Sequence, residues 1–334
     1  MNWSTVNNLL ITILIAANLF LVFNILRREH SRHYLDDETV SDAISLLREK
    51  GLDVDENSVP LRKFDALVYE SPYNDEYYTG VAKRLSGAER EMLLSLPGGG
   101  FSIICEGGAT VEFDGEFGFV YSKNDTFSQR AYTDITFDNV DSYRNRSEEL
   151  SGSARRKAAQ LAEELLRLED SSENAPEAEI TAMFRDKNND LTYVFARQRF
   201  NDYLVSSHYA VCVFDGTDVL GAYGRWFFSD FGEVHSAELW DQINILFADM
   251  ENLKNASNND ADSSNKSDGE DTNNGDTDTT ELRLPSVKSM EACYAVYWNA
   301  DKTSLYFIPA WLIEHSDGQA ILYNALNGTV YSKK

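Results

Sequence analysis

Side chains able to do chemistry are plentiful in this chain, but none has the spacing of a known catalytic site. The histidines do not form the His-Glu-x-x-His pattern of zinc peptidases or a Cys/His metal-binding spacing. The chain contains neither a Gly-x-Ser-x-Gly nucleophile elbow nor a phosphate-binding loop. Carboxylates are abundant, yet no spacing singles out an acid–base pair. The five histidines are His30, His33, His208, His235 and His315. We therefore expect no enzymatic activity and no catalytic, cofactor or metal site.

The cysteines and tryptophans are expected to have structural roles. An odd and sparse set of cysteines is not a disulfide framework, so these side chains are expected as small buried hydrophobes, with a single disulfide left open. The three cysteines, each in an apolar strand-like run, are Cys105, Cys212 and Cys293. Four tryptophans are interpreted as core or interface anchors rather than as a ligand-binding box: Trp226, Trp240, Trp298 and Trp311.

One amide lies where a polar group is costly. Asn18 is near the middle of residues 9–26, a run without charged side chains. An amide in hydrocarbon needs a partner, and an interhelical hydrogen bond contributes about 0.6 to 2 kcal/mol. Ala16 and Ala17 would let a second helix approach closely. Asn18, Ala16 and Ala17 are therefore candidate partner contacts; the alternative is an isolated amide tolerated in a single-pass helix. Asn24, nearer the helix end, can be hydrated.

The run that holds Asn18 is predicted to be a transmembrane anchor. As a helix rising 1.5 Å per residue, residues 9–26 nearly cross a bilayer core of about 30 Å. No basic residue precedes the run and no small-residue cleavage pattern follows it, which argues against a signal peptide. Arg27, Arg28 and Arg32 follow it and favour a cytoplasmic domain. Long domains can be translocated despite such charges, so the orientation is open at this point.

Composition limits the partners of the remaining chain. The 334 residues carry 55 acidic and 30 basic side chains, for a net charge of −25. Such a charge excludes nucleic acid and anionic lipid headgroups as partners of the globular part. A solvated acidic surface or a basic partner fits better. An apolar content of 43% with 12% aromatic residues is enough for real cores, and the length leaves room for two domains.

Hydrophobic periodicity predicts an α+β chain. Val40, Ile44 and Leu47 form one face of a helix over residues 39–50, with Thr39 and Asp42 as a capping box and Gly51 after its end. The other predicted helices cover residues 75–85, 86–96, 147–168 and 236–253. The predicted strands cover residues 66–70, 101–106, 109–113, 117–122, 179–185, 191–200, 209–214, 219–228, 292–298, 305–315, 319–324 and 329–331.

Residues 254–283 differ in kind from the rest of the chain. They are almost wholly Asn, Asp, Ser, Thr and Gly, without aromatic side chains. Such a segment cannot bury enough apolar surface to offset its ordering entropy, so it is predicted to be a disordered acidic insertion. The alternating Asp register of a calcium-binding loop is absent from it.

Both ends of the chain resemble the YycI proteins. The opening Met1-Asn-Trp3, running straight into the anchor, resembles the start of that family, and Trp3 joins the candidate partner contacts for this reason. The segments Pro309-Ala-Trp-Leu-Ile313, Asp317-Gly318 and Tyr323-Asn-Ala-Leu-Asn-Gly328 resemble the PepSY-like module that closes YycI. Residues 203–223 resemble the strand pair that precedes this module.

The resemblance implies an organisation and a topology. It implies a single N-terminal transmembrane helix followed by two antiparallel-sheet-plus-helix, PepSY-like domains, with the N-terminus in the cytoplasm and the main domain outside. Two features depart from the family: the basic residues expected before the anchor are missing, and residues 254–283 replace a tight connection. The expected parts are residues 1–8 in the cytoplasm, anchor 9–26, stalk 27–37, an N-terminal domain 38–172, a C-terminal domain of 177–253 with 284–334, and the insertion 254–283.

The resemblance also implies a function. YycI and its relative YycH are membrane-anchored, extracytoplasmic, non-enzymatic regulators of the WalK sensor histidine kinase in Gram-positive bacteria. The expected partners are therefore a WalK-like kinase and a YycH-like protein, reached through the transmembrane helix and the outer domain, at the cell envelope. Two alternatives stay open: a PepSY-like inhibitor of a cell-surface peptidase, and a membrane-tethered scaffold without a kinase.

Overall fold

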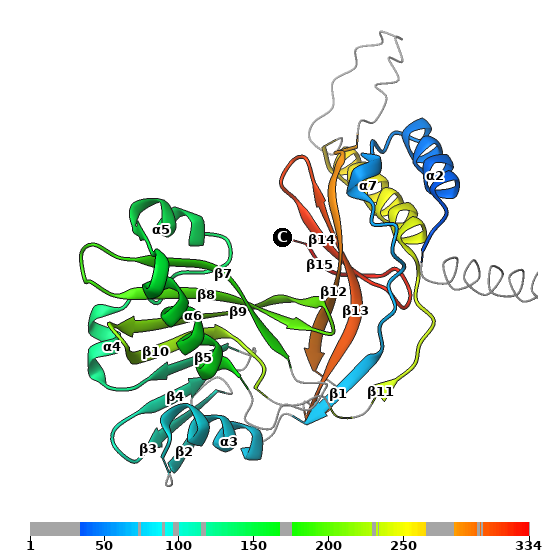
Figure 1. The fold of residues 1–334 in the computed structure, drawn as a ribbon. Helices are drawn as coiled ribbons and strands as arrows, with labels where there is room; N and C mark the ends of the chain where they lie inside the picture. The colour runs from blue at the N-terminus through cyan, green and yellow to red at the C-terminus, as the bar shows by residue number, and fades with distance from the viewer. Residues whose placement is uncertain are drawn as a thin grey trace, which may run out of the picture. The chain divides into compact units, whose positions relative to one another are not determined.

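The structure is a computed structural model (Figure 1). It describes residues 34–72, 75–88, 91–95, 100–114, 118–167, 176–228, 232, 234–264, 284–298, 301 and 303–333. The predicted cytoplasmic residues, the anchor 9–26 and most of the stalk lie outside this part. Among the helices that are described, none combines the length and the apolar character that a membrane crossing needs.

The described residues have a mixed α+β fold, as predicted. They contain six α-helices and one large, mostly antiparallel sheet. The described residues form two compact units: those within 34–66, 237–292 and 309–333 form the first, and those within 67–236 and 293–308 form the second. Strands β12 (Val287–Trp298) and β13 (Ser304–His315) contribute to both. The predicted division into two independently folding domains stays a prediction. Its N-terminal domain is 38–172, and its C-terminal domain is 177–253 with 284–334.

In the first unit, two helices lie side by side next to a small antiparallel sheet (Figure 1). The helices are α2 (Asp37–Glu49) and α7 (Gln242–Ser264), with the short helix η1 (Glu56–Ser58) after α2. Strand β13 pairs with β14 (Ala320–Asn324), and β14 pairs with β15 (Val330–Lys333). The turn between β13 and β14 is Asp317-Gly318, as predicted, with Gly318 at φ +89°.

The second unit is built on the long strand β9 (Tyr203–Asp215). One edge of β9 pairs with β8 (Thr192–Phe200); the other pairs with β10 (Asp218–Arg225) and, in parallel, with β12. The remaining strands are β1 (Val68–Pro72), β2 (Glu91–Ser95), β3 (Phe101–Cys105), β4 (Thr110–Phe113), β5 (Gly118–Ser122), β6 (Glu148–Glu149), β7 (Glu177–Arg185) and β11 (Val234–His235). The helices are α3 (Asp75–Ser86), α4 (Asp125–Arg130), α5 (Val140–Arg146) and α6 (Gly152–Leu166).

The spacing of its apolar residues explains why α2 forms a helix with one buried face. Val40, Ile44 and Leu47 are buried, as predicted. Gly51 ends the helix at φ +96°, where its N–H donates to the carbonyl of Arg48. Only glycine adopts this conformation without strain, which is why it follows the last turn. The capping-box prediction was wrong: the helix begins at Asp37, and its N-cap residue makes no side-chain hydrogen bond.

Three predicted helices differ from the structure. Residues 91–95 form strand β2, paired in register with β3, because backbone pairing across the hairpin outweighs local helix preference. The predicted helix 147–168 is shortened to α6, since residues 148–149 form β6 and pair with β7. Helix α7 begins six residues later than predicted and runs to Ser264, because an established helix extends cheaply. The insertion therefore begins beyond Ser264, and residues 265–283 lie outside the described part.

The core of the second unit is aromatic. Tyr193 stacks on Phe184 with 5.4 Å between ring centroids, and Phe195 stacks on Tyr209 at 5.3 Å. The three cysteines are free and buried, as predicted, and none forms a disulfide. Gln198 is also buried; its side-chain amide binds both the N–H and the carbonyl of Phe227, so its polar atoms are satisfied.

Buried His208 predicts a specific loss of stability in acid. Burial lowers the pKa of His208 from 6.5 to about 4, and Arg225 adds to this effect. The unfolded chain takes up this proton at a higher pH than the folded chain. The free energy of unfolding should therefore fall by up to about 3 kcal/mol as pH drops through that window. Urea unfolding at pH 7 and pH 4.5 should show a smaller pH effect in His208→Gln than in the unchanged chain.

The exposed His235 supplies the control for this experiment. His235→Gln should keep the pH effect of the unchanged chain, since its ring lies at the surface. An undiminished pH effect in His208→Gln would show that other groups are responsible.

Candidate functional site

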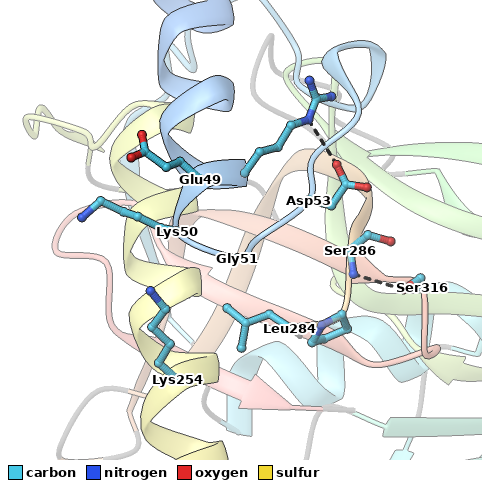
Figure 2. Close-up of a pocket in the computed structure, with 10 residues that line it drawn as sticks. Glu49, Lys50, Gly51, Asp53, Lys254, Leu284, Ser286 and Ser316 are labelled. Atoms are coloured by element: carbon cyan, nitrogen blue, oxygen red, sulfur yellow. Dashed lines mark hydrogen bonds and ion pairs between the residues drawn. The ribbon is translucent and has the colours of Figure 1, made fainter. Parts of the chain in front are cut away.

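A groove of about 790 Å³ is hollowed into the first unit between the end of α2, helix α7 and the start of β12 (Figure 2). Its lining comes from four separate stretches of sequence. They are residues 48–51 with Asp53, Lys254 on α7, residues 284–286, and Ser316 after β13. A hollow of this size accommodates a ligand of small-molecule dimensions.

The loop after α2 makes a rigid wall of the groove. Arg48 donates from Nε to Oδ1 of Asp53 at 3.1 Å and from Nη2 to the carbonyl of Val54 at 2.6 Å. The N–H of Val287 donates to the carbonyl of Asp53, and Val54 and Val287 form a parallel bridge. These bonds hold the loop on the first residues of β12. Arg48 and Asp53 are thereby engaged with each other, as the dashed line in Figure 2 shows.

Two serines form the adjoining wall. The N–H of Ser286 donates to Oγ of Ser316 at 3.1 Å, and the N–H of Ser316 donates to the carbonyl of Ser286 at 2.9 Å. Ser316 uses its Oγ as an acceptor in this pair, so its hydroxyl hydrogen is available to another group. The hydroxyl of Ser286 makes no hydrogen bond within the described residues, and it too can donate to a bound molecule.

Two lysines supply the charge of the groove. Lys254 extends from α7 toward the end of α2, where Lys50 follows the last helical turn (Figure 2). Within the part of the chain that the structure describes, neither ammonium group forms an ion pair. Glu49 contributes the one lining carboxylate besides Asp53. The groove thus combines two unpaired ammonium groups with two hydroxyl donors.

A buried polar cluster joins α7 to the sheet of the same unit. Tyr323 donates from its hydroxyl to Oδ1 of Asp249 at 2.6 Å, and Asn252 donates to the tyrosine oxygen at 3.2 Å. Nε2 of His315 lies 3.3 Å from the same Asp249 oxygen, and both side chains are fully buried. Burial, reinforced by the Asp249 carboxylate, raises the pKa of Tyr323. Asp249, His315 and Tyr323 are buried away from solvent, so this cluster contributes to the scaffold.

Exposed apolar side chains also lie at two other places on the surface of the described residues. Trp240 is 40% exposed beside a hollow of about 220 Å³ in the first unit, which Phe64, Leu239 and Asp241 also line. In the second unit, Met92 of β2 lies directly across from Ile104 of β3, with side chains 61% and 43% exposed. Exposed apolar groups on neighbouring strands are typical of contact surfaces.

The candidate contact residues of the sequence lie outside the described part: Trp3, Ala16, Ala17 and Asn18. The expectation for the tryptophans is confirmed for Trp226 and Trp311, which are buried, whereas Trp240 is partly exposed. Within the described ranges, no three His, Cys, Asp or Glu side chains are grouped closely enough to hold a metal ion. Sequence reasoning missed the groove, because its lysines and serines are far apart along the chain.

Comparisons with known proteins identified no relative of this chain. No protein-family model, no curated protein and no solved structure matches this chain.

The buried cluster predicts that removing the Tyr323 hydroxyl lowers the stability of the protein. Tyr323→Phe leaves Oδ1 of Asp249 without its O–H donor inside the protein. The free energy of unfolding should fall by about 1–3 kcal/mol, the penalty for an unsatisfied buried polar group. Urea unfolding followed by tryptophan fluorescence measures this loss.

Tyr132→Phe is the matched control. The Tyr132 hydroxyl makes no hydrogen bond within the described residues, while its ring stacks on Tyr193. The control should change the free energy of unfolding by less than about 0.5 kcal/mol. Equal losses of unfolding free energy in the two variants would mean that the Tyr323–Asp249 hydrogen bond contributes no measurable stability.

Proposed function

We propose that this protein is a membrane-anchored, extracytoplasmic accessory protein that regulates a sensor histidine kinase of the WalK type. In this proposal residues 9–26 cross the cell membrane with the N-terminus in the cytoplasm. The described units lie outside, and the kinase is contacted by the transmembrane helix and the outer domain. A YycH-like protein is a further proposed partner. No enzymatic step is part of the proposal.

The packing of the C-terminal motif supports the proposal. Part of the C-terminal motif lies on two neighbouring strands, where Trp311 is directly across from Tyr323 and Ile313 from Ile321. Trp311, Ile313 and Tyr323 are fully buried. This part of the resemblance therefore concerns residues that build one hydrophobic hairpin.

The buried positions of this motif restrict which side chains can occupy them. Trp311 donates from Nε1 to the carbonyl of Trp240 and packs edge-on against Phe64. A smaller or polar residue would leave a cavity or an unsatisfied carbonyl, each costing several kcal/mol. A likeness in such residues points to shared architecture more strongly than one in exposed residues. The proposed regulation of a kinase rests on that likeness together with the predicted anchor.

The proposed topology predicts chemical labelling from outside the cell. A cysteine at the exposed position of Asn255, Asn255→Cys, should react with a membrane-impermeant maleimide on intact cells. The native cysteines are buried, and burial raises the pKa of the Cys212 thiol, so background reaction should be low. The unchanged chain measures that background. Labelling that occurs only after lysis would place the domain in the cytoplasm.

The proposed helix contact predicts that Asn18 and Asn24 differ in their effect on recovery of the kinase. Asn18→Leu removes the amide near the middle of the anchor, and recovery of the co-expressed kinase from detergent extracts should decrease. One lost interhelical hydrogen bond of about 0.6–2 kcal/mol corresponds to roughly a 3- to 30-fold weaker association. Immunoprecipitation from matched membranes measures the recovery.

Asn24→Leu is the matched control, because it makes the same chemical change near the helix end, where water can hydrate the amide. Its recovery of the kinase should equal that of the unchanged chain. Undiminished recovery of both the kinase and a self-dimer in Asn18→Leu would exclude Asn18 as the contact.

A further inference from the structure

We propose that the groove between α2, α7 and the start of β12 binds a small anionic ligand through a phosphoryl group. The proposal does not depend on the kinase assignment. It rests on the two lysine ammonium groups and two serine hydroxyls that line the groove and donate to no acceptor among the described residues (Figure 2).

The charge of the groove is opposite to that of the chain. The whole chain has 55 acidic and 30 basic side chains, whereas the groove is lined by three cationic side chains and two carboxylates. Arg48 and Asp53 form an ion pair with each other. The two positive charges of Lys50 and Lys254 then exceed the single negative charge of Glu49.

The donors of the groove favour a phosphoryl group over a carboxylate. A carboxylate is best bound by the two-pronged guanidinium of arginine, and Arg48 already uses Nε and Nη2 on Asp53 and Val54. Lysine binds phosphate oxygens as a compact charge. The hydroxyls of Ser286 and Ser316 add short, directional donors. Several oxygens on one phosphorus atom can accept from all of these groups at once.

The wall that presents these donors is rigid, while the lysines remain movable. The serines are fixed by two mutual hydrogen bonds, both donated by backbone N–H groups, and the loop after α2 is held by Arg48. A bound ligand therefore needs to order only the two lysine stems. Ordering each stem costs side-chain entropy, which limits the affinity of a small anion.

Calorimetry with tripolyphosphate tests the proposal on the full chain in detergent micelles at pH 7 and 0.15 M NaCl. The unchanged chain should bind the probe. The double variant Lys50→Gln/Lys254→Gln should bind about tenfold or more weakly, because two charged hydrogen bonds are lost. Lys50→Arg/Lys254→Arg keeps both charges and should retain most of the affinity.

Matched controls separate a local site from general charge. Lys157→Gln/Lys187→Gln removes two exposed lysines of the second unit, so it changes the net charge equally and should leave binding unchanged. Equal losses in the two glutamine variants, or undiminished binding in Lys50→Gln/Lys254→Gln, would overturn the proposal. Citrate is the carboxylate probe: weaker binding of citrate supports phosphoryl recognition, and equal or tighter binding would refute it.

Discussion

The first unit depends on the burial of Trp311. This side chain lies on β13, donates to the carbonyl of Trp240 just before α7, and packs edge-on against Phe64 with 5.4 Å between ring centroids. One indole thus joins three stretches of sequence that are far apart along the chain. Gly328 belongs to the same arrangement, because a Cβ atom there would lie 2.5 Å from the Trp240 ring. Packing of this kind is intolerant of changes in volume.

The groove is a consequence of that packing. Trp311 fixes β13, and the Asp249–Tyr323 hydrogen bond holds the neighbouring strand β14 against α7. Ser316 follows His315 at the end of β13 and meets Ser286. Helix α7, held by the Asp249–Tyr323 bond, presents Lys254 about one and a half turns beyond Asp249. Scaffold and candidate site are therefore coupled: the buried cluster determines where the exposed donors lie. Such an arrangement places a binding group on rigid elements with its support beneath it.

The sequence predicted most elements whose signals are local. The apolar spacing of Val40, Ile44 and Leu47 identified α2, and turn residues such as Asp317-Gly318 identified the hairpins. It failed where pairing with a distant strand decides the outcome. Residues 91–95 read as part of a helix but are paired along their whole length with β3. The exposed apolar pair Met92 and Ile104 arises from that same register and could not be foreseen.

The sequence by itself determined the α+β class, the acidic character, the burial of the cysteines and the apolar run that is predicted to anchor the chain. Those properties depend on composition and on spacing over a few residues. Only the tertiary structure decided that Lys50, Lys254, Ser286 and Ser316 line one groove. It also decided that Asp249, His315 and Tyr323 meet in one buried cluster. The physical reason is that these contacts form between distant segments, and their distances are set by the packing of a helix on a sheet.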